Sequence, residues 1–188
     1  HPPAIESLDA EFDKSIELNA VGLPVCRWNL IAATSTASAK KACPEAIVGT
    51  GEAEVEVAFP EQEPFSATGP ITLFNGGVQG ATTLLLIHTY VDVPAPTAVI
   101  ATVKITKVQR GHFGLDAVAA IPRIAGGAGS VTAFKITIGR RFTYKGQKQS
   151  YLTASCPTGT YYTEGEVEFS DATKLHITHA LPCTPIGK

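Results

Sequence analysis

Most of the chain alternates between apolar and polar residues with a period of two, which is the pattern of half-buried β-strands. Residues 52–57 show this most clearly, because three glutamates alternate there with alanine and valine. Residues 82–93 contain the nearly continuous apolar run LLLIHTYV, which predicts a strand covered on both faces. Further strands are expected at 5–18 (with a turn at 13–15), 70–74 (ended by Asn75-Gly76-Gly77), 97–108, 112–121, 131–142, 150–155, 160–169 and 174–181.

Residues 27–46 break this pattern. They are rich in alanine and serine, and Leu30, Ala33 and Ala37 recur at helical spacing, which predicts one or two short helices. Turn signals every 8–12 residues, without long helices between the strands, exclude Rossmann and TIM architectures. We therefore predict an all-β fold, a β-sandwich of roughly nine to eleven strands with a short disulfide-bound helical insertion near residues 27–45. The glycine-rich stretch 125–129 is too short to be a linker, so residues 1–188 are expected to form a single domain.

The four cysteines fall into two local pairs, Cys26 with Cys43 and Cys156 with Cys183. Local pairing is the simplest of three possible connectivities, and the sequence leaves the choice open. Each bridge would close a loop of about 15–30 residues and contribute about 3 kcal/mol. No Cys-x-x-Cys motif indicates a zinc or thioredoxin-type site. The chain also lacks methionine, even at position 1, so we expect a processed or trimmed product. Together with 17% charged residues, these features predict a secreted or cell-surface protein.

Charge is balanced overall but unevenly distributed. The net charge of −2 argues against a nucleic-acid partner, and no apolar run approaches the length of about 20 residues of a membrane span. Residues 1–63 hold eleven acidic and four basic residues, whereas residues 93–160 hold one acidic and nine basic residues. The simpler explanation is that acidic and basic strands pair within one fold. Opposed faces that favour head-to-tail contact between copies, or a basic patch for anionic polysaccharide, are the alternatives.

His1 is the most specific candidate for chemistry. A free amino-terminal histidine chelates copper through its amine and ring nitrogens, and a second histidine completes the brace that copper polysaccharide monooxygenases carry on a β-sandwich. His88, His112, His176 and His179 are the candidate second ligands, although His176 and His179 would lie on opposite faces of a strand. A histidine left at position 1 by cleavage is the simpler explanation. We therefore expect no cofactor, and copper is the alternative.

No motif assigns a catalytic residue. His-Glu-x-x-His, Gly-x-Ser-x-Gly and phosphate-loop patterns are absent from the sequence. The glutamate rows at 52–56 and 164–168 would suit a carboxylate pair or calcium, but such period-two rows are typical of solvated strand faces. Whether the chain is an enzyme stays open, and the sequence favours a non-enzyme. Tyr161 and Tyr162 place one ring on each face of a strand, which suits a sugar-stacking site.

A series of motifs spans nearly the whole chain in order. They are Gly22-Leu23-Pro24-x-Cys26, Cys43-Pro44, Ile47-Val48-Gly49-x-Gly51, Phe59-Pro60, Gly69-Pro70, Phe74-Asn75-Gly76, Val93-Pro94-Ala95-Pro96-Thr97, Ile121-Pro122, Gly126-Gly127-x-Gly129-Ser130, Ser150-Tyr151-Leu152 and Cys156-Pro157. In these motifs the chain resembles an uncharacterised family of exported actinobacterial β-rich proteins. The resemblance implies export, and it implies further residues upstream of Pro2-Pro3, including a strand whose loss leaves an unpaired sheet edge. It carries over no catalytic residue.

We accordingly predict a non-enzymatic secreted or cell-surface structural or interaction domain. An exported β-sandwich with an exposed edge can lend strands to its neighbours, so self-association into a filament or surface layer is expected. Its partners would be copies of itself, other cell-surface proteins or polysaccharide, and no nucleic acid. The alternatives are a copper-binding protein or copper monooxygenase built on His1, and a carbohydrate-binding module that uses Tyr161 and Tyr162.

Overall fold

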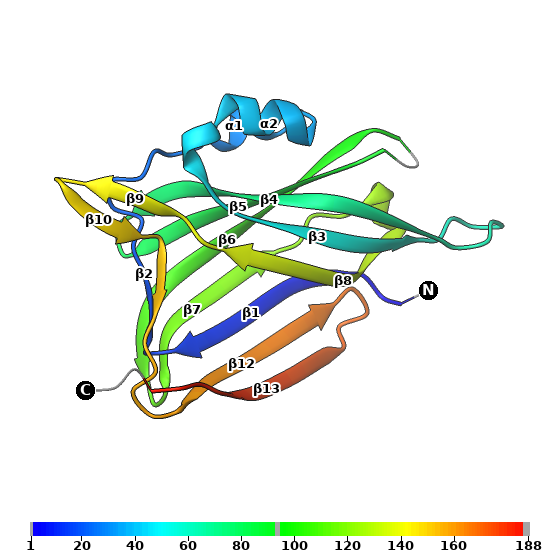
Figure 1. Cartoon of the computed structure of the whole chain (residues 1–188). Coiled ribbons are helices and arrows are strands. Elements are labelled where there is room, and N and C mark those ends of the chain that lie inside the picture. The colour runs from blue at the N-terminus through cyan, green and yellow to red at the C-terminus, as the bar shows by residue number, and fades with distance from the viewer. Residues whose placement is uncertain (1, 93–94, 186–188) are drawn as a thin grey trace.

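The fold is all-β with one helical insertion, as predicted (Figure 1). The computed structural model describes residues 2–92 and 95–185, so His1 and residues 93–94 lie outside it. The described residues form two α-helices, two short 3-10 helices (Pro44–Ala46 and Ala125–Gly127) and thirteen strands. The helices are α1 (Trp28–Ile31) and α2 (Thr36–Ala42), and the strands are β1 (Ile5–Asp13), β2 (Ile16–Leu18), β3 (Ile47–Val57), β4 (Phe65–Gln79), β5 (Thr82–Val91), β6 (Thr97–Arg110), β7 (Phe113–Ala120), β8 (Gly129–Ile138), β9 (Arg141–Tyr144), β10 (Gln147–Ser150), β11 (Leu152–Ala154), β12 (Thr160–Phe169) and β13 (Lys174–Pro182).

Nine strands form one antiparallel sheet in the order β13-β12-β1-β7-β6-β5-β4-β3-β8. Strands β3 to β7 follow one another as hairpins, β1 lies between β7 and β12, and β8 pairs with β3. The sheet curls, so that strands near its two ends contribute to the same inner face (Figure 1). Leu8 of β1 and Ile136 of β8 both pack on the core cluster around Leu73. Two separate ribbons, β9–β10 and β2–β11, lie beside the main sheet.

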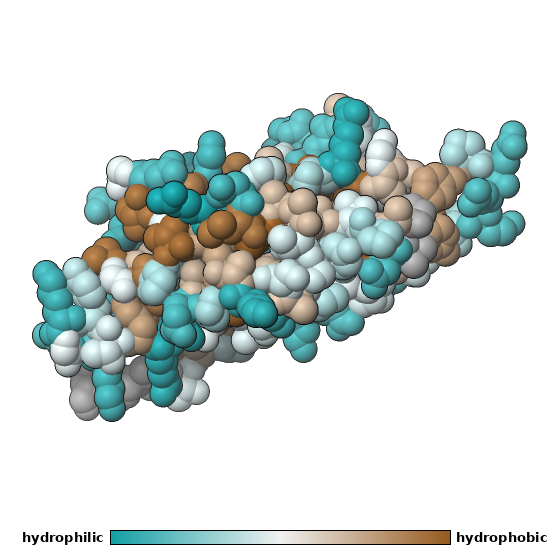
Figure 2. Space-filling model, turned by 90° about the horizontal axis from the view of Figure 1, so that it is seen from above, coloured by the Kyte–Doolittle hydropathy of each residue, from teal (hydrophilic) through white to brown (hydrophobic). Residues whose placement is uncertain are grey.

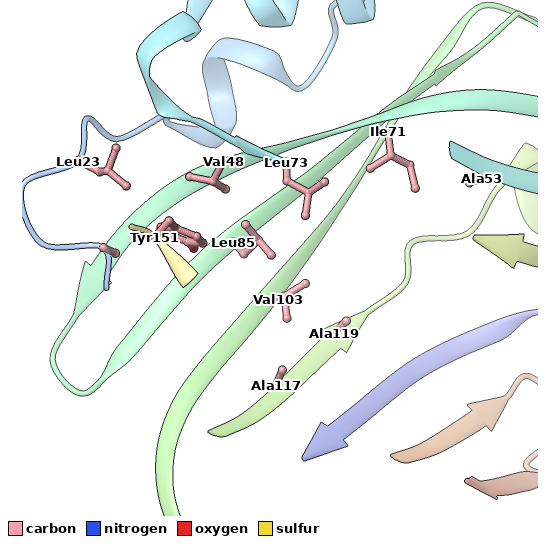
Figure 3. Packing of buried hydrophobic residues seen from close by; sticks show 11 residues of the cluster. Leu23, Val48, Ala53, Ile71, Leu73, Leu85, Val103, Ala117, Ala119 and Tyr151 are labelled. Carbon is pink, nitrogen blue, oxygen red and sulfur yellow. The ribbon is translucent and has the colours of Figure 1, made fainter. Parts of the chain in front are cut away.

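Alternate residues of β4 and β5 pack on the two faces of the sheet. Leu73 and Leu85 point to the inner face, where they join Val103 and the fully buried ring of Tyr151 (Figure 3). Their neighbours along the strands belong to the opposite cluster, beneath the helices. This confirms the prediction that the apolar run of β5 is covered on both faces, and removal of so much apolar surface from water is the main stabilising contribution.

The helical insertion packs on the outer face, and a helix cap and a disulfide stabilise it. Ser35 caps α2, because its side chain accepts a hydrogen bond from the Ser38 N–H. Ala39 is fully buried against the outer cluster. The Cys26–Cys43 bridge closes the insertion, with 5.6 Å between the two Cα atoms. Cys156 bonds Cys183 in the same way, so the local pairing expected from the sequence is confirmed.

Several strand boundaries differ from the expected ones: β3 and β4 begin earlier, and the strand expected at 150–155 is divided between β10 and β11. The strand expected to end at Asn75-Gly76-Gly77 continues to Gln79 through a bulge. Asn75 is fully buried, donates to the Pro24 carbonyl and accepts from the Gly77 N–H, so it stabilises the bulge from both sides. The single strand expected at 131–142 is instead two, β8 and β9, separated at residues 139–140. In the described part of the chain, neither α-helix has the length and apolar character to cross a membrane.

Candidate interaction edge

Strand β13 is one edge of the main sheet, and all nine of its residues are exposed. Leu175 lies opposite Val167 of β12, which belongs to the inner face with Leu8. The inner-face row of β13 is therefore Leu175, Ile177, His179 and Leu181. It is open to solvent, and its three apolar residues are 46–50% exposed. An exposed apolar row along a sheet edge is a site at which another strand gains by docking.

The backbone of β13 offers hydrogen-bonding groups to such a strand. At its two ends, the Phe169 N–H donates to the Thr173 carbonyl (3.0 Å), and the Cys183 N–H donates to the Gly159 carbonyl (2.9 Å). Because hydrogen-bonded positions alternate along an antiparallel ladder, the odd-numbered residues of β13 face β12 and the even-numbered ones face outward. The outward-facing positions are Lys174, His176, Thr178, Ala180 and Pro182.

Natural proteins protect sheet edges with prolines, bulges and inward-pointing charges. The β12–β13 register runs without a shift, and the protective residues Lys174 and Pro182 lie only at the two ends of β13. Between them the inner face carries His179 and no Lys, Arg, Asp or Glu. The opposite edge, β8, is better protected, because its ladder with β3 shifts at Thr132. Of the two edges, β13 is therefore the better candidate for an interaction.

Both ends of β13 are fixed in place. At the C-terminal end, the Cys156–Cys183 disulfide ties the strand to the loop before β12. At the N-terminal end, Asp171 closes the turn by accepting hydrogen bonds from the Thr173 hydroxyl (2.6 Å) and the Thr173 N–H (3.0 Å), which lower the pKa of Asp171. A strand held at both ends loses little further freedom when it docks, which favours association.

Ion pairs hold the outer face of β13 to β12. Lys174 Nζ lies 2.6 Å from Glu166 and 3.9 Å from Glu168, and His176 Nε2 lies 3.1 Å from Glu166. The hydrogen bond from Lys174 lowers the pKa of Glu166 and raises that of Lys174. The glutamate row at 164–168 is thus a solvated strand face with cross-strand ion pairs.

The acidic face continues onto β1 and β7. Arg110 lies 2.8 Å from Glu11 and also pairs with Asp116. Burial, followed by the neighbouring carboxylates of Asp116 and Glu11, raises the pKa of Asp9. With the pair between Arg140 and Glu45 at 2.7 Å, these contacts place basic segments beside acidic ones, as the simpler explanation of the charge distribution predicted.

The remaining candidate histidines lie in separate settings. His88 is fully buried beneath the helices, with Nε2 3.0 Å from the Thr34 carbonyl. His112 stacks on the ring of Tyr162, with 4.3 Å between the ring centroids. His176 and His179 lie on opposite faces of β13 by strand parity. Across the part of the chain that the structure describes, no three His, Cys, Asp or Glu side chains gather as metal ligands. His1 is not among those residues.

Tyr161 and Tyr162 also lie on opposite faces of β12, both partly buried. Tyr161 is opposite Leu181 and shares the inner face with the apolar row of β13. Sequence reasoning missed that row, although the alternation in LHITHALP signals it, because the sequence does not say which strand becomes an edge.

Comparison with protein-family models, with curated proteins and with solved structures gives no match for this chain.

Proposed function

We propose that this protein is an exported, non-enzymatic interaction domain that binds a second copy of itself by strand addition at β13. The observation that carries the proposal is the uncovered edge of β13, with outward backbone groups and the apolar row Leu175, Ile177 and Leu181. The two disulfides support export, because such bonds persist in oxidising compartments.

One register overlaps the whole of β13 with itself. Antiparallel pairing about a two-fold axis at Thr178 sets Lys174 against Pro182 of the second copy, and His176 against Ala180. The outward-facing residues then meet one another and exchange hydrogen bonds, except that Pro182 has no N–H and can only accept. On the inner face, Leu175 meets Leu181 of the second copy twice, and Ile177 meets His179 twice. No two like charges lie opposite each other in this register, so the edge is complementary to itself.

The same edge also suits longer assemblies. A filament or surface layer requires a second edge, and β8 is the other end of the main sheet. The Gly139 N–H bonds the Val48 carbonyl, so Ile136 presents its N–H away from β3. The bulge of β8 favours a closed dimer through β13 over an open filament.

Sedimentation velocity from micromolar to millimolar protein tests the proposal. We expect a monomer–dimer equilibrium that Thr178→Pro weakens about tenfold or more, because the proline removes an N–H at the two-fold axis. This N–H faces away from β12, so the variant should unfold thermally near the wild type. Thr178→Val is the matched control, since it keeps the N–H, and Ile177→Lys should also dissociate the dimer.

The outcomes separate clearly. A monomer at all concentrations contradicts self-association, and so does a dimer that is insensitive to both Thr178→Pro and Ile177→Lys. Polymers that are lost with either Thr178→Pro or Ile136→Pro would show head-to-tail growth through β13 and β8, which is the filament form of the proposal.

A further inference from the structure

A cavity of about 1210 Å³ opens on the inner side of the sheet, away from β13. The β9–β10 ribbon, the segment from β2 to Val21 and the ends of β4 to β7 surround it. Known ligand cavities occupy roughly 300–1,000 Å³, so this space is large enough for a ligand with a long body.

The cavity is lined by more cations than anions. Lys107, Arg141 and Lys148 border it, against a single acidic residue, Glu17. Among the described residues none of these three cations forms an ion pair or a side-chain hydrogen bond. Elsewhere among the described residues, Arg110, Arg140 and Lys174 pair with carboxylates, whereas the exposed Lys40, Lys104 and Lys135 form no ion pair. What distinguishes the three cavity cations is that they border one space.

The placement of these cations is specific. Lys107 lies opposite Leu115 in the β6–β7 ladder, so it points to the inner face that is otherwise apolar. Arg141 and Lys148 lie on one face of the β9–β10 ribbon, because their partners in register are Ser150 and Thr143. Phe142 lies on the other face of the ribbon, against the core. The three cations thus come from three strands and border one space, with exposed side chains.

About half of the remaining lining is apolar. Leu18, Ile105 and Phe142 line the cavity and are only partly buried against the core. The lining also includes Val21 and Val78, both more than half exposed.

Figure 2 shows apolar surface gathered beside the helices, where α1 and the loop before it carry Val25, Trp28 and Leu30, each 47–56% exposed. Apolar surface is thus exposed both within the cavity and on this side of the molecule.

We infer that this cavity binds a long-chain amphiphilic anion, such as a fatty carboxylate. The aliphatic chain lies against Leu18 and Ile105, and the carboxylate lies among the exposed side chains of Lys107, Arg141 and Lys148. Charge complementarity carries this inference, because unpaired cations around an apolar space suit an anion with an apolar body. The site does not depend on association through β13.

Titration calorimetry of the full chain with dodecanoate, below its micellar concentration, tests the inference. We expect one-to-one binding, weakened about five- to tenfold by Lys107→Gln and similarly by Arg141→Gln, because each removes one attractive charge. Lys40→Gln is the matched control, since Lys40 is exposed on α2 and remote from the cavity lining. Dodecyltrimethylammonium offers the same chain with a cationic head and should bind at least tenfold more weakly.

Nuclear magnetic resonance locates the binding. Dodecanoate should shift the amide signals of β9, β10 and the end of β6, and Thr178→Pro should leave its affinity unchanged. Equal affinity for dodecyltrimethylammonium, or wild-type affinity in both cavity variants, would overturn the inference. Shifts confined to β13 would also overturn it, as would co-sedimentation with phosphatidylglycerol vesicles without binding of dodecanoate.

Discussion

The carboxylate of Asp13 accepts a hydrogen bond of 3.1 Å from the backbone N–H of Tyr162. This bond joins the end of β1 to β12, which is 149 positions away in sequence. The same carboxylate accepts the N–H of Ser15 at 2.9 Å and its hydroxyl at 2.7 Å, so it also closes the turn between β1 and β2. Asp13 is 6% exposed, and one buried side chain therefore sets both the turn and the docking of the C-terminal hairpin.

Replacing this carboxylate should destabilise the protein. Burial raises the pKa of Asp13, but the hydrogen bonds from Ser15 and Tyr162 outweigh it, and the pKa lies below its ordinary value of 3.8. We expect Asp13→Asn to cost about 1–3 kcal/mol at neutral pH, because at least one buried donor loses its acceptor. Urea unfolding followed by circular dichroism measures this change. Asp171→Asn, in an exposed turn, is the control and should change stability much less.

The pH dependence of this contribution has a definite sign. Because the folded-state pKa is lowered, the stabilisation is complete well above pH 3.8 and is lost as the pH falls through the folded-state value. The difference in unfolding free energy between the wild type and Asp13→Asn should therefore shrink as the pH falls below about 4. A difference between the two proteins that stays constant from neutral to strongly acidic pH would contradict this account.

Asp9 should behave in the opposite way. Burial, Asp116 and Glu11 raise its pKa, so the charged carboxylate is unfavourable in the folded state. This penalty is absent below pH 3.8, grows as the pH rises from 3.8 to the raised folded-state pKa, and is complete above that value. We expect Asp9→Asn to stabilise the protein at neutral pH by about 0.5 kcal/mol, a small figure because the site is largely solvated. Thermal unfolding at neutral and acidic pH measures it, and a lower melting temperature at neutral pH would refute it.

Strand periodicity was enough to predict the fold class and most elements of this protein. Residues 160–169 were expected as a strand and form β12 with the same bounds. The bulge at Asn75 was not predictable, because Asn75-Gly76-Gly77 has the composition of a turn. The strand continues through pairing with β5 and through hydrogen bonds from Asn75 to the Leu23 and Pro24 carbonyls, which are distant in sequence. The sequence of β13 alone cannot show that it is an edge strand, because its place in the sheet depends on how all the strands pair.

The same limit applies to the cavity. Val103, Ile105 and Lys107 are alternate residues of β6, so the strand pattern predicts that Lys107 points to the same inner face as the other two. The convergence of Arg141 and Lys148 on it could not, because the break between β8 and β9 turns the later ribbon out of the main sheet. Long-range topology, which periodicity does not encode, therefore creates both candidate sites.

His88 should make the protein sensitive to mild acid. Burial lowers the pKa of this histidine below its ordinary value of 6.5. As the pH falls below 6.5, the unfolded chain binds a proton that the folded protein does not, so stability should decline there. In His88→Gln, which retains an N–H donor for the Thr34 carbonyl, the decline should be smaller between about pH 6.5 and 5. His112→Gln, in an exposed turn, is the control, and an equal decline in all three proteins would refute the role of His88.

Tyr151 has a fully buried ring at the centre of the inner cluster (Figure 3). Its hydroxyl meets no hydrogen-bond partner among the described residues, and burial raises its pKa to about 12. Removing an unpaired buried hydroxyl removes a desolvation cost, so Tyr151→Phe should be neutral or stabilise the protein by up to about 1 kcal/mol. Tyr151→Ala should instead cost about 3–5 kcal/mol, because it leaves a cavity.

Two measurements on Tyr151 distinguish packing from hydrogen bonding. In spectrophotometric titration of the folded protein, Tyr151 should be among the tyrosines that stay protonated until about pH 12, and Tyr151→Phe should remove that step. Urea unfolding of the Phe and Ala variants then compares loss of the hydroxyl with loss of the ring. A destabilisation of more than about 1 kcal/mol in Tyr151→Phe would mean that the hydroxyl is hydrogen-bonded in solution. Tyr151 would then stabilise the core through a hydrogen bond from its hydroxyl as well as through packing of its ring.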